Sequence, residues 1–251
     1  PSSTLASTSF LASSDFPRSF KACAFSGKRF SNFSNMTLDS PIHDPSHPIT
    51  GVDVCFANPG TSEMHFVAAL DSNPEMRCVL GLFEGVVTGA ADGYGRMARK
   101  PAATLTHLGP GLGNGLANLH NAKKARTPIV NVIGDHATYH RQYDAPLTSD
   151  VEGVARPMSN WIRVSQTADS VAQDGAEAVQ AALSPPGQVA SLILPADTAW
   201  SLTSAVANPK EPLKPKGADH QVVMEVAKVL KRDPNVVFLI NGFLSEGRMS
   251  Q

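Results

Sequence analysis

The sequence predicts an α/β protein, a doubly wound parallel sheet with helices on both faces. Between residues 51 and 200, short apolar runs typical of buried strands alternate with longer segments of helical spacing. These intervening segments are long enough to be crossover helices, the connection that parallel strands need. The 251 residues exceed one domain of ordinary size. We therefore expect one complete domain and a remainder.

The first half of this domain contains three expected strands. They cover Val52–Phe56, Cys78–Phe83 and Ala102–His107. Asn58-Pro59-Gly60 ends the first strand, and Thr61 or Ser62 can cap a helix that runs through Leu70. Glu63 lies in the first turn of that helix, where the helix dipole favours a carboxylate.

The second expected helix, Glu84–Met97, is unusually rich in glycine. Each of its glycines should destabilise a helix by about 1 kcal/mol relative to alanine. They are Gly85, Gly89, Gly93 and Gly95. Close packing of the backbone against another surface would explain this cost. After the third strand, the glycine-rich segment 109–115 is expected to lead as a loop into a helix that ends near Ala125.

The second half of the domain repeats the alternation. Its expected strands are Pro128–Ile133, which is followed by Gly134 and Asp135, then Asn160–Val164 and Val189–Leu194. Thr167 caps a long amphipathic helix that ends at Leu183. This series closes the predicted domain at about residue 200.

The remainder lies at both ends of the chain. Residues 201–217 contain three prolines among polar residues and are expected to be an interdomain linker. A helix over His220–Leu230 and a strand over Val236–Ile240 then begin a second α/β domain, residues 218–251, which has too few elements for a core. Residues 1–50 form a leader that we expect to be disordered.

Composition limits the partners and the compartment. The net charge is 21 − 22 = −1, which removes any whole-chain electrostatic argument for nucleic acid or an anionic membrane. No apolar run approaches 18 residues, and the three cysteines have no disulfide or zinc spacing. Residues 1–36 are basic and rich in Ser and Phe, which suits an organelle transit segment. An equally weighted alternative is a disordered tail, or translated non-coding sequence before a true start at Met36. We expect a cytoplasmic or organellar protein with a small-molecule ligand.

The candidate ligand site lies beyond the carboxyl ends of the strands, where open α/β sheets bind ligands. Glu84 follows an apolar run and opens a nearly uncharged helix. It either serves the helix dipole or exchanges a proton with a ligand nitrogen. His107 ends a strand beside the glycine segment, as a ligand-facing donor or as a buried, satisfied histidine.

Two other motifs have weaker interpretations. Segment 109–115 with Asp135 is compatible with a dinucleotide turn, but Leu116 stands where a third small residue belongs and Pro110 removes an amide donor. His136 and His140 have the spacing of a metal pair on a helix, but no third ligand is evident nearby. Plain hydrogen bonding is the default role of these two histidines.

Taken as a set, four motifs resemble the N-terminal, pyrimidine-binding domain of thiamine diphosphate enzymes. They are Phe56–Thr61, Gly81–Gly85, Ala90–Arg96 and Gly109–Asn114, in the order and spacing of that family. The resemblance covers about residues 51–200. Within the family it is closest to the acetolactate synthase and benzoylformate decarboxylase branch. Residues 134–143 resemble those of acetolactate synthase-like large subunits.

This resemblance implies a cofactor, thiamine diphosphate, and a 2-oxo acid substrate. Glu84 would hydrogen-bond N1′ of the cofactor's aminopyrimidine and promote formation of its carbon nucleophile. The turn at Pro59, Gly60 and Thr61 would line the site, and Asn114 would lie near the pyrimidine. His107 matches a substrate-side histidine of some decarboxylases. His136 and His140 are candidate proton relays.

The chain also departs from the family. Members of the family hold the diphosphate and a divalent metal such as Mg²⁺ in a separate C-terminal domain, through a Gly-Asp-Gly motif that does not occur here. The other half of the site normally comes from a neighbouring subunit. We therefore expect an N-terminal domain of a 2-oxo acid decarboxylase or carboligase that is inactive by itself. The alternatives are a non-catalytic partner of a full-length homologue and a dinucleotide-binding oxidoreductase.

Overall fold

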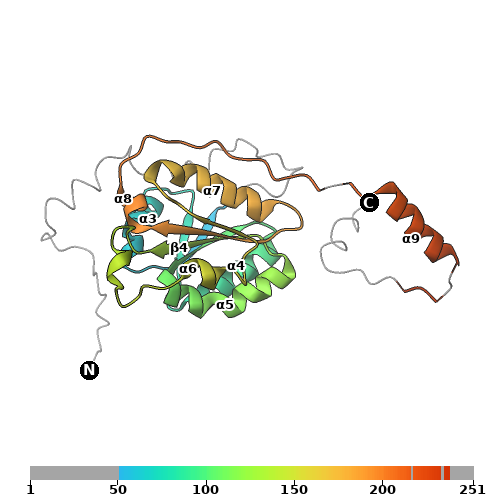
Figure 1. Cartoon of the computed structure of the whole chain (residues 1–251), viewed down its shortest axis with the longest axis horizontal. Helices are drawn as coiled ribbons and strands as arrows, with labels where there is room; N and C mark the ends of the chain where they lie inside the picture. Colours follow the sequence, from blue (N-terminus) through green and yellow to red (C-terminus); the bar gives the residue numbers. More distant parts are fainter. Residues whose placement is uncertain (1–50, 216, 233–234, 238–251) are drawn as a thin grey trace, which may run out of the picture.

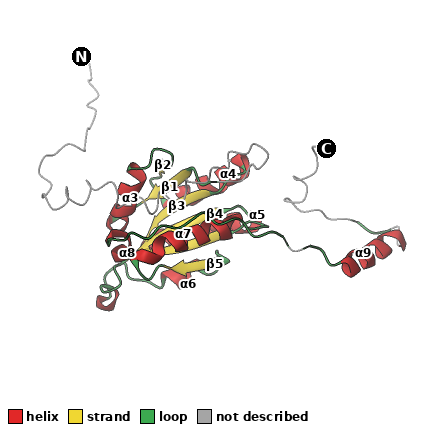
Figure 2. Cartoon of the chain, turned by 90° about the horizontal axis from the view of Figure 1, so that it is seen from above, coloured by secondary structure: helices red, strands yellow, loops and turns green. Residues whose placement is uncertain are grey.

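The protein is described here by a computed structural model, which covers residues 51–215, 217–232 and 235–237. Within this part of the chain, six parallel strands form one sheet in the order β2-β1-β3-β4-β6-β5 (Figure 2). The strands are β1 (Val54–Asn58), β2 (Arg77–Leu80), β3 (Ala102–His107), β4 (Ile129–Asp135), β5 (Trp161–Val164) and β6 (Val189–Pro195). The predicted fold class is confirmed.

Helices cover both faces of the sheet (Figure 1). The helices on one face are α3 (Met64–Asp71), α7 (Ala168–Leu183) and α8 (Ala196–Trp200). Those on the other face are α4 (Glu84–Ala98), α5 (Leu108–Ala125) and α6 (Val151–Ala155). Each face buries its own apolar cluster, because alternate residues of the central strands point to opposite sides.

The first β-α unit differs from its prediction at the start of the helix. Neither Thr61 nor Ser62 caps it, because both lie inside a 3₁₀ turn, η1 (Thr61–Glu63), that precedes α3. The Glu63 carboxylate instead accepts a hydrogen bond from the backbone N–H of Gly60 at 2.6 Å. The side chain predicted to serve the helix dipole therefore satisfies an orphan amide directly.

Strand β2 ends at Leu80, three residues before the predicted end at Phe83. It pairs only with β1, so it is an edge strand. The Gly81 N–H still donates to the Ala57 carbonyl at 2.9 Å, and the chain bends at residues 82 and 83. The apolar run continues past the strand, with Leu82 at 90% exposed. Glu84 thus begins α4 after a bend rather than directly after a strand.

The predicted glycine loop at 109–115 is wrong, because this segment forms the first two turns of α5. Leu108 follows β3 directly and has a left-handed φ of 54°, which turns the chain from strand to helix without a loop. Pro110 is accommodated in the first turn, where its missing N–H costs nothing. A phosphate-cradling loop is therefore absent at this position.

The second half follows the prediction closely. Thr167 caps α7, and its side chain accepts a hydrogen bond from the N–H of Ser170. Three short elements were not predicted: α6, α8 and the 3₁₀ turn η2 (Arg141–Tyr143). Each is too short to show a hydrophobic period in the sequence.

Residues 201–215 contain neither helix nor strand and run along α7. Lys210 pairs with Glu177 of α7 at 2.8 Å, and the Leu213 N–H donates to Ser184. The expected helix after this segment is present as α9 (His220–Arg232), which Figure 1 shows apart from the sandwich. The expected strand Val236–Ile240 lies partly outside the described residues, and residues 235–237 form no strand. The leader, residues 1–50, lies wholly outside them.

Candidate functional site at the carboxyl end of the sheet

The predicted site residues gather where β1, β3 and β4 end. These strands are neighbours and run in parallel, so their carboxyl ends meet at one edge of the sheet. Asn58 of β1 pairs in register with Thr106, and His107 pairs with Gly134 of β4. The turn after β1 and the starts of α4 and α5 lie at this same edge.

Glu84 is the first residue of α4 and is 8% exposed. The amide Nδ2 of Asn114 in α5 donates to its Oε2 at 3.0 Å. Its other oxygen, Oε1, faces Gly111, where an added Cβ would lie 2.7 Å away. One oxygen is therefore held by α5, while the other faces a backbone position that carries no side chain.

Helices α4 and α5 approach closely enough to bond side chain to backbone. Asn118 Nδ2 donates to the Gly85 carbonyl at 2.6 Å, and Thr88 Oγ1 donates to the Gly115 carbonyl at 3.0 Å. A Cβ on Gly89 would lie 3.0 Å from the Asn118 amide. The expected close packing of the glycine-rich helix is thus confirmed at Gly89, whereas an added Cβ on Gly93 would meet open space.

His107 lies at the end of β3 and packs flat on Gly60. A Cβ at Gly60 would overlap the imidazole ring. The ring nitrogen Nδ1 lies 2.8 Å from Glu63 Oε2, the oxygen that also accepts the Gly60 N–H. Gly111 lies between the two predicted catalytic groups, since its added Cβ would be 3.4 Å from the His107 Cβ as well as close to Glu84.

Glu63 is the most deeply buried carboxylate at this edge, at 2% exposed. Burial raises the pKa of Glu63, against the opposing effects of the Gly60 N–H and of His107. Its second oxygen, Oε1, has no hydrogen-bond partner. That oxygen occupies the position that a side chain on Gly134 would need.

The remaining predicted residues lie outside the bonded pair of Glu84 and Asn114. Pro59 is half-buried and Thr61 is exposed, and both lie in the turn that carries Gly60. His136 and His140 follow β4 in a stretch that is not helical, with ring centroids 5.3 Å apart. Asp135 is bonded by Arg141 and by the His136 N–H. Asp135 is therefore engaged in local bonding rather than in ribose binding.

Two site features escaped the sequence interpretation. The sequence predicts only a helix-dipole role for Glu63 and no individual role for Gly111 or Gly134. Glu63 lies three residues after Gly60, the spacing at which the glutamate of a capping box bonds back to the N-cap N–H, and this spacing is the available sign of the Glu63–Gly60 bond. The space that the glycines leave for the carboxylates is visible only in three dimensions.

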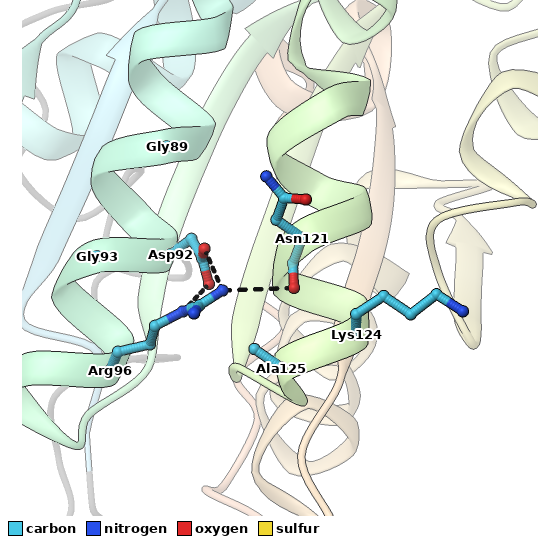
Figure 3. Close-up of a pocket in the computed structure, with 7 residues that line it drawn as sticks. All are labelled: Gly89, Asp92, Gly93, Arg96, Asn121, Lys124 and Ala125. Atoms are coloured by element: carbon cyan, nitrogen blue, oxygen red, sulfur yellow. Dashed lines mark hydrogen bonds and ion pairs between the residues drawn. The ribbon is translucent and has the colours of Figure 1, made fainter. Parts of the chain in front are cut away.

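A shallow groove lies elsewhere, between the outer surfaces of α4 and α5 (Figure 3). Arg96 forms a two-point ion pair with Asp92, at 2.9 and 2.7 Å, and also approaches the Asn121 carbonyl. The charge of Arg96 is therefore already compensated. Lys124 points away from this pair in Figure 3, so the groove has no converging set of charges.

No metal centre is found in the part of the chain that the structure describes, where no three His, Cys, Asp or Glu side chains are placed to hold an ion. Nor is any helix among these residues long and apolar enough to cross a membrane.

Known proteins resemble this chain over most of the described sandwich. Residues 49–157 match the model of the family described as thiamine pyrophosphate enzyme, N-terminal TPP binding domain. The chain is 58% identical over 197 residues to a protein of Mycobacterium tuberculosis named "putative acetolactate synthase large subunit IlvX", covering 78% of this chain and 38% of that protein. It is 29% identical over 211 residues to benzoylformate decarboxylase of Pseudomonas aeruginosa, covering 82% and 38%.

Solved structures agree on the fold. Benzoylformate decarboxylase from Polynucleobacter necessarius superposes with a TM-score of 0.65 at 27% identity, over 72% of this chain and 34% of that one. The Rhodococcus jostii 4-hydroxybenzoylformate decarboxylase gives 0.62 at 24% identity, over 72% and 34%. The chain spans about two fifths of the length of the curated relatives named above.

Proposed function

Because this chain belongs to the thiamine pyrophosphate enzyme family and carries its N-terminal TPP binding domain, we propose that it binds the aminopyrimidine of thiamine diphosphate through Glu84. The observation that carries the proposal is the geometry of that carboxylate. It is buried at the first turn of α4, held at Oε2 by Asn114, and faces the bare backbone of Gly111 at Oε1. These residues fit a flat ring with a basic nitrogen.

Glu84 acts in this proposal by sharing a proton with a pyrimidine ring nitrogen. Asn114 orients the carboxylate, and Gly111 leaves the space that a ring edge needs. When bound, thiamine diphosphate supplies a carbon nucleophile and an electron sink for 2-oxo acid chemistry. The protein's own task is to bind the ring and to hold a proton at one atom.

His107 is the proposed substrate-side residue. It lies across Gly111 from Glu84, and its side chain is partly open to solvent. A histidine here can donate a proton to a 2-oxo acid or its product, or accept a proton from it. Pro59, Gly60 and Thr61 form the turn beside it and complete the proposed lining. We propose decarboxylation or carboligation of a 2-oxo acid as the reaction.

NMR titration of the ¹⁵N-labelled chain with 4-amino-5-hydroxymethyl-2-methylpyrimidine tests this proposal. We expect saturable shifts of the amides of Glu84, Gly111 and Asn114. Glu84→Gln should weaken binding about tenfold, since it removes one charge-assisted hydrogen bond. The matched control, Glu75→Gln, alters an exposed carboxylate in the loop before β2 and should bind normally. Equal binding by both variants would remove Glu84 from the site.

The diphosphate and Mg²⁺ are proposed to be held outside the described residues, by another part of the assembly. Three exposed apolar residues flank Glu84 in the sequence: Leu82 at 90%, Phe83, and Val86 at 59% exposed. Exposed apolar patches of this kind mark interaction surfaces. The proposed partner is a second subunit of this family, either a copy of this chain or a full-length homologue.

Sedimentation velocity tests the association. We expect the chain to form dimers, with Leu82→Glu raising the dissociation constant at least tenfold. Met97→Glu is the matched control, because Met97 is equally exposed at the far end of α4. A monomer at all concentrations, both by itself and with a full-length homologue, would contradict the proposed surface.

For the compartment we propose the cytoplasm, or an organelle if the basic, Ser-rich residues 1–36 are a transit segment.

A further inference from the structure

Glu63 and His107 form a buried pair that the role proposed for Glu84 does not use. Glu63 comes from the turn after β1 and His107 from the end of β3, 44 residues apart in sequence. Their carboxylate and imidazole lie 2.8 Å apart, with the carboxylate almost wholly buried. A buried carboxylate is costly unless its hydrogen bonds are complete. This one keeps an unpartnered oxygen, so it calls for an explanation beyond stability.

The hydrogen bonds identify which ring nitrogen carries the proton. Glu63 Oε2 already accepts the Gly60 N–H at 2.6 Å, and an ionised carboxylate has no proton to donate. Whenever Glu63 is ionised, His107 Nδ1 must therefore be the donor in the 2.8 Å contact. In a neutral imidazole the other nitrogen, Nε2, then carries the lone pair. Within the described residues, Nε2 has no hydrogen-bond partner of its own.

The backbone around the pair leaves room for the ring and the carboxylate in the positions that they occupy. Gly60 supports one face of the imidazole, and Gly134 accommodates the free oxygen of Glu63, because a Cβ at either glycine would overlap these groups. Leu108, directly after His107, has a left-handed φ of 54° that a leucine rarely adopts. The carboxyl ends of β1, β3 and β4 thus all border one carboxylate–imidazole contact.

We propose that Glu63 is a positioning residue that holds His107 in the Nδ1–H tautomer, with Nε2 presented to the ligand site as a proton acceptor. In the alternative, Glu63 only accepts the Gly60 N–H, and either tautomer of His107 can form. The two differ in whether the tautomer depends on residue 63. The use of Nε2 on a substrate rests on the proposed function, whereas the tautomer itself does not.

Imidazole ¹⁵N NMR of the full chain, without any ligand, decides between them. The spectrum is recorded well above the usual imidazole pKa of about 6.5, and the His107 signals are assigned by their loss in His107→Gln. We expect His107 to be protonated at Nδ1 in the unmodified chain. Glu63→Leu removes the acceptor, so the proton should move mainly to Nε2, the form that an unconstrained imidazole favours.

A conservative variant and a control keep the test specific. Glu63→Gln can place its carbonyl oxygen where Oε2 lies, so it should retain the Nδ1–H form and show that the acceptor, not packing, sets the tautomer. Glu75→Leu should change nothing at His107. Retention of Nδ1–H in Glu63→Leu, or an Nε2–H form in the unmodified chain, would overturn the proposal. Because no cofactor is present, failure of the Glu84 proposal leaves this result unaffected.

Discussion

A carboxylate lies beyond each end of strand β1, and the two differ in how completely they are hydrogen-bonded. Asp53 precedes the strand, and both of its oxygens are bonded, Oδ1 by the Tyr94 hydroxyl at 2.6 Å and Oδ2 by Lys100 at 3.0 Å. Glu63 follows the strand, and one of its oxygens has no partner. Burial pushes both pKa values upward, but the partners of Asp53 leave its pKa lowered, whereas the pKa of Glu63 stays raised.

The difference separates a structural carboxylate from a functional one. A complete set of hydrogen bonds makes a buried or half-buried charge stabilising, as at Asp53. An incomplete set costs stability and persists where the site gains something from it. Glu63, the carboxylate with the incomplete set, lies at the carboxyl edge of the sheet, where open α/β folds bind ligands. Asp53 lies at the opposite edge.

The largest effect that tests this contrast is expected from Gly134→Ala. The new methyl group would overlap the Glu63 carboxylate and its Cγ, and Glu63 is buried against the central strand β4, so unfolding should become easier by about 1–3 kcal/mol. Urea denaturation followed by circular dichroism measures the change. It should be accompanied by a shift of the His107 ring signals, because the displaced carboxylate carries that contact.

Gly113→Ala provides the matched control for this prediction. Gly113 lies in α5, and an added Cβ there would meet nothing within 4 Å. Alanine should therefore stabilise the helix by about 0.5–1 kcal/mol. Equal effects at the two glycines would show that the position of Oε1 is not enforced by packing.

The next effect is the pH dependence that Glu63 imposes. In the unfolded chain a glutamate loses its proton near pH 4.3, whereas the raised pKa of Glu63 lets the folded chain keep it to higher pH. The folded state therefore binds more protons over this window, and stability falls as pH rises through it. Below the window Glu63 imposes no cost.

Glu63→Gln cannot ionise, so it should not show this decline. Denaturation midpoints of the two proteins, measured from pH 4 to pH 8, should move in favour of the glutamine variant as pH increases. A gap that stays constant across this range would mean that Glu63 titrates normally and that the contrast with Asp53 is wrong.

Much of this architecture was predictable from the sequence, because strand and helix periods are local. Strand β3 and the cap at Thr167 were predicted to the residue, and Glu84 was correctly placed at the first turn of α4. The incorrect predictions lie where packing against a neighbouring element outweighs the local conformational preference of a segment. Segment 109–115 has the composition of a loop, yet two of its glycines, Gly111 and Gly115, allow close contacts of α5 with Glu84 and Thr88.

The site was predictable only in part, for the same reason. Glu84 and His107 each follow a strand or an apolar run, a position that sequence spacing reveals. Their relation through Gly111, and the pairing of His107 with Glu63, depend on which strand ends become neighbours in the sheet. That order, β2-β1-β3-β4, is set by packing over the whole fold and leaves no local trace.

A smaller effect is expected at the other end of β1. Asp53→Asn removes a half-buried ion pair with Lys100 and weakens the bond from Tyr94, which together should cost about 0.5–1.5 kcal/mol at neutral pH. Because the pKa of Asp53 is lowered, its contribution is present above the unfolded value near pH 3.9 and is lost as pH falls through the folded value. The variant and the parent should therefore converge in acid, the opposite trend to that of Glu63.

The smallest effect is spectroscopic and concerns Tyr94 alone. Burial, with the hydrogen bond to Asp53 and the negative charge of that carboxylate, raises the pKa of Tyr94 to about 12. Absorbance of phenolate during alkaline titration should show one late-ionising tyrosine, identified by its loss in Tyr94→Phe. Asp53→Asn should bring that ionisation to lower pH, because an amide exerts no charge on the phenolate. If Tyr94 ionised at the same pH in both proteins, the Tyr94 hydroxyl would not be bonded to Asp53 Oδ1, and a complete set of hydrogen bonds at Asp53 could not explain why the two carboxylates differ.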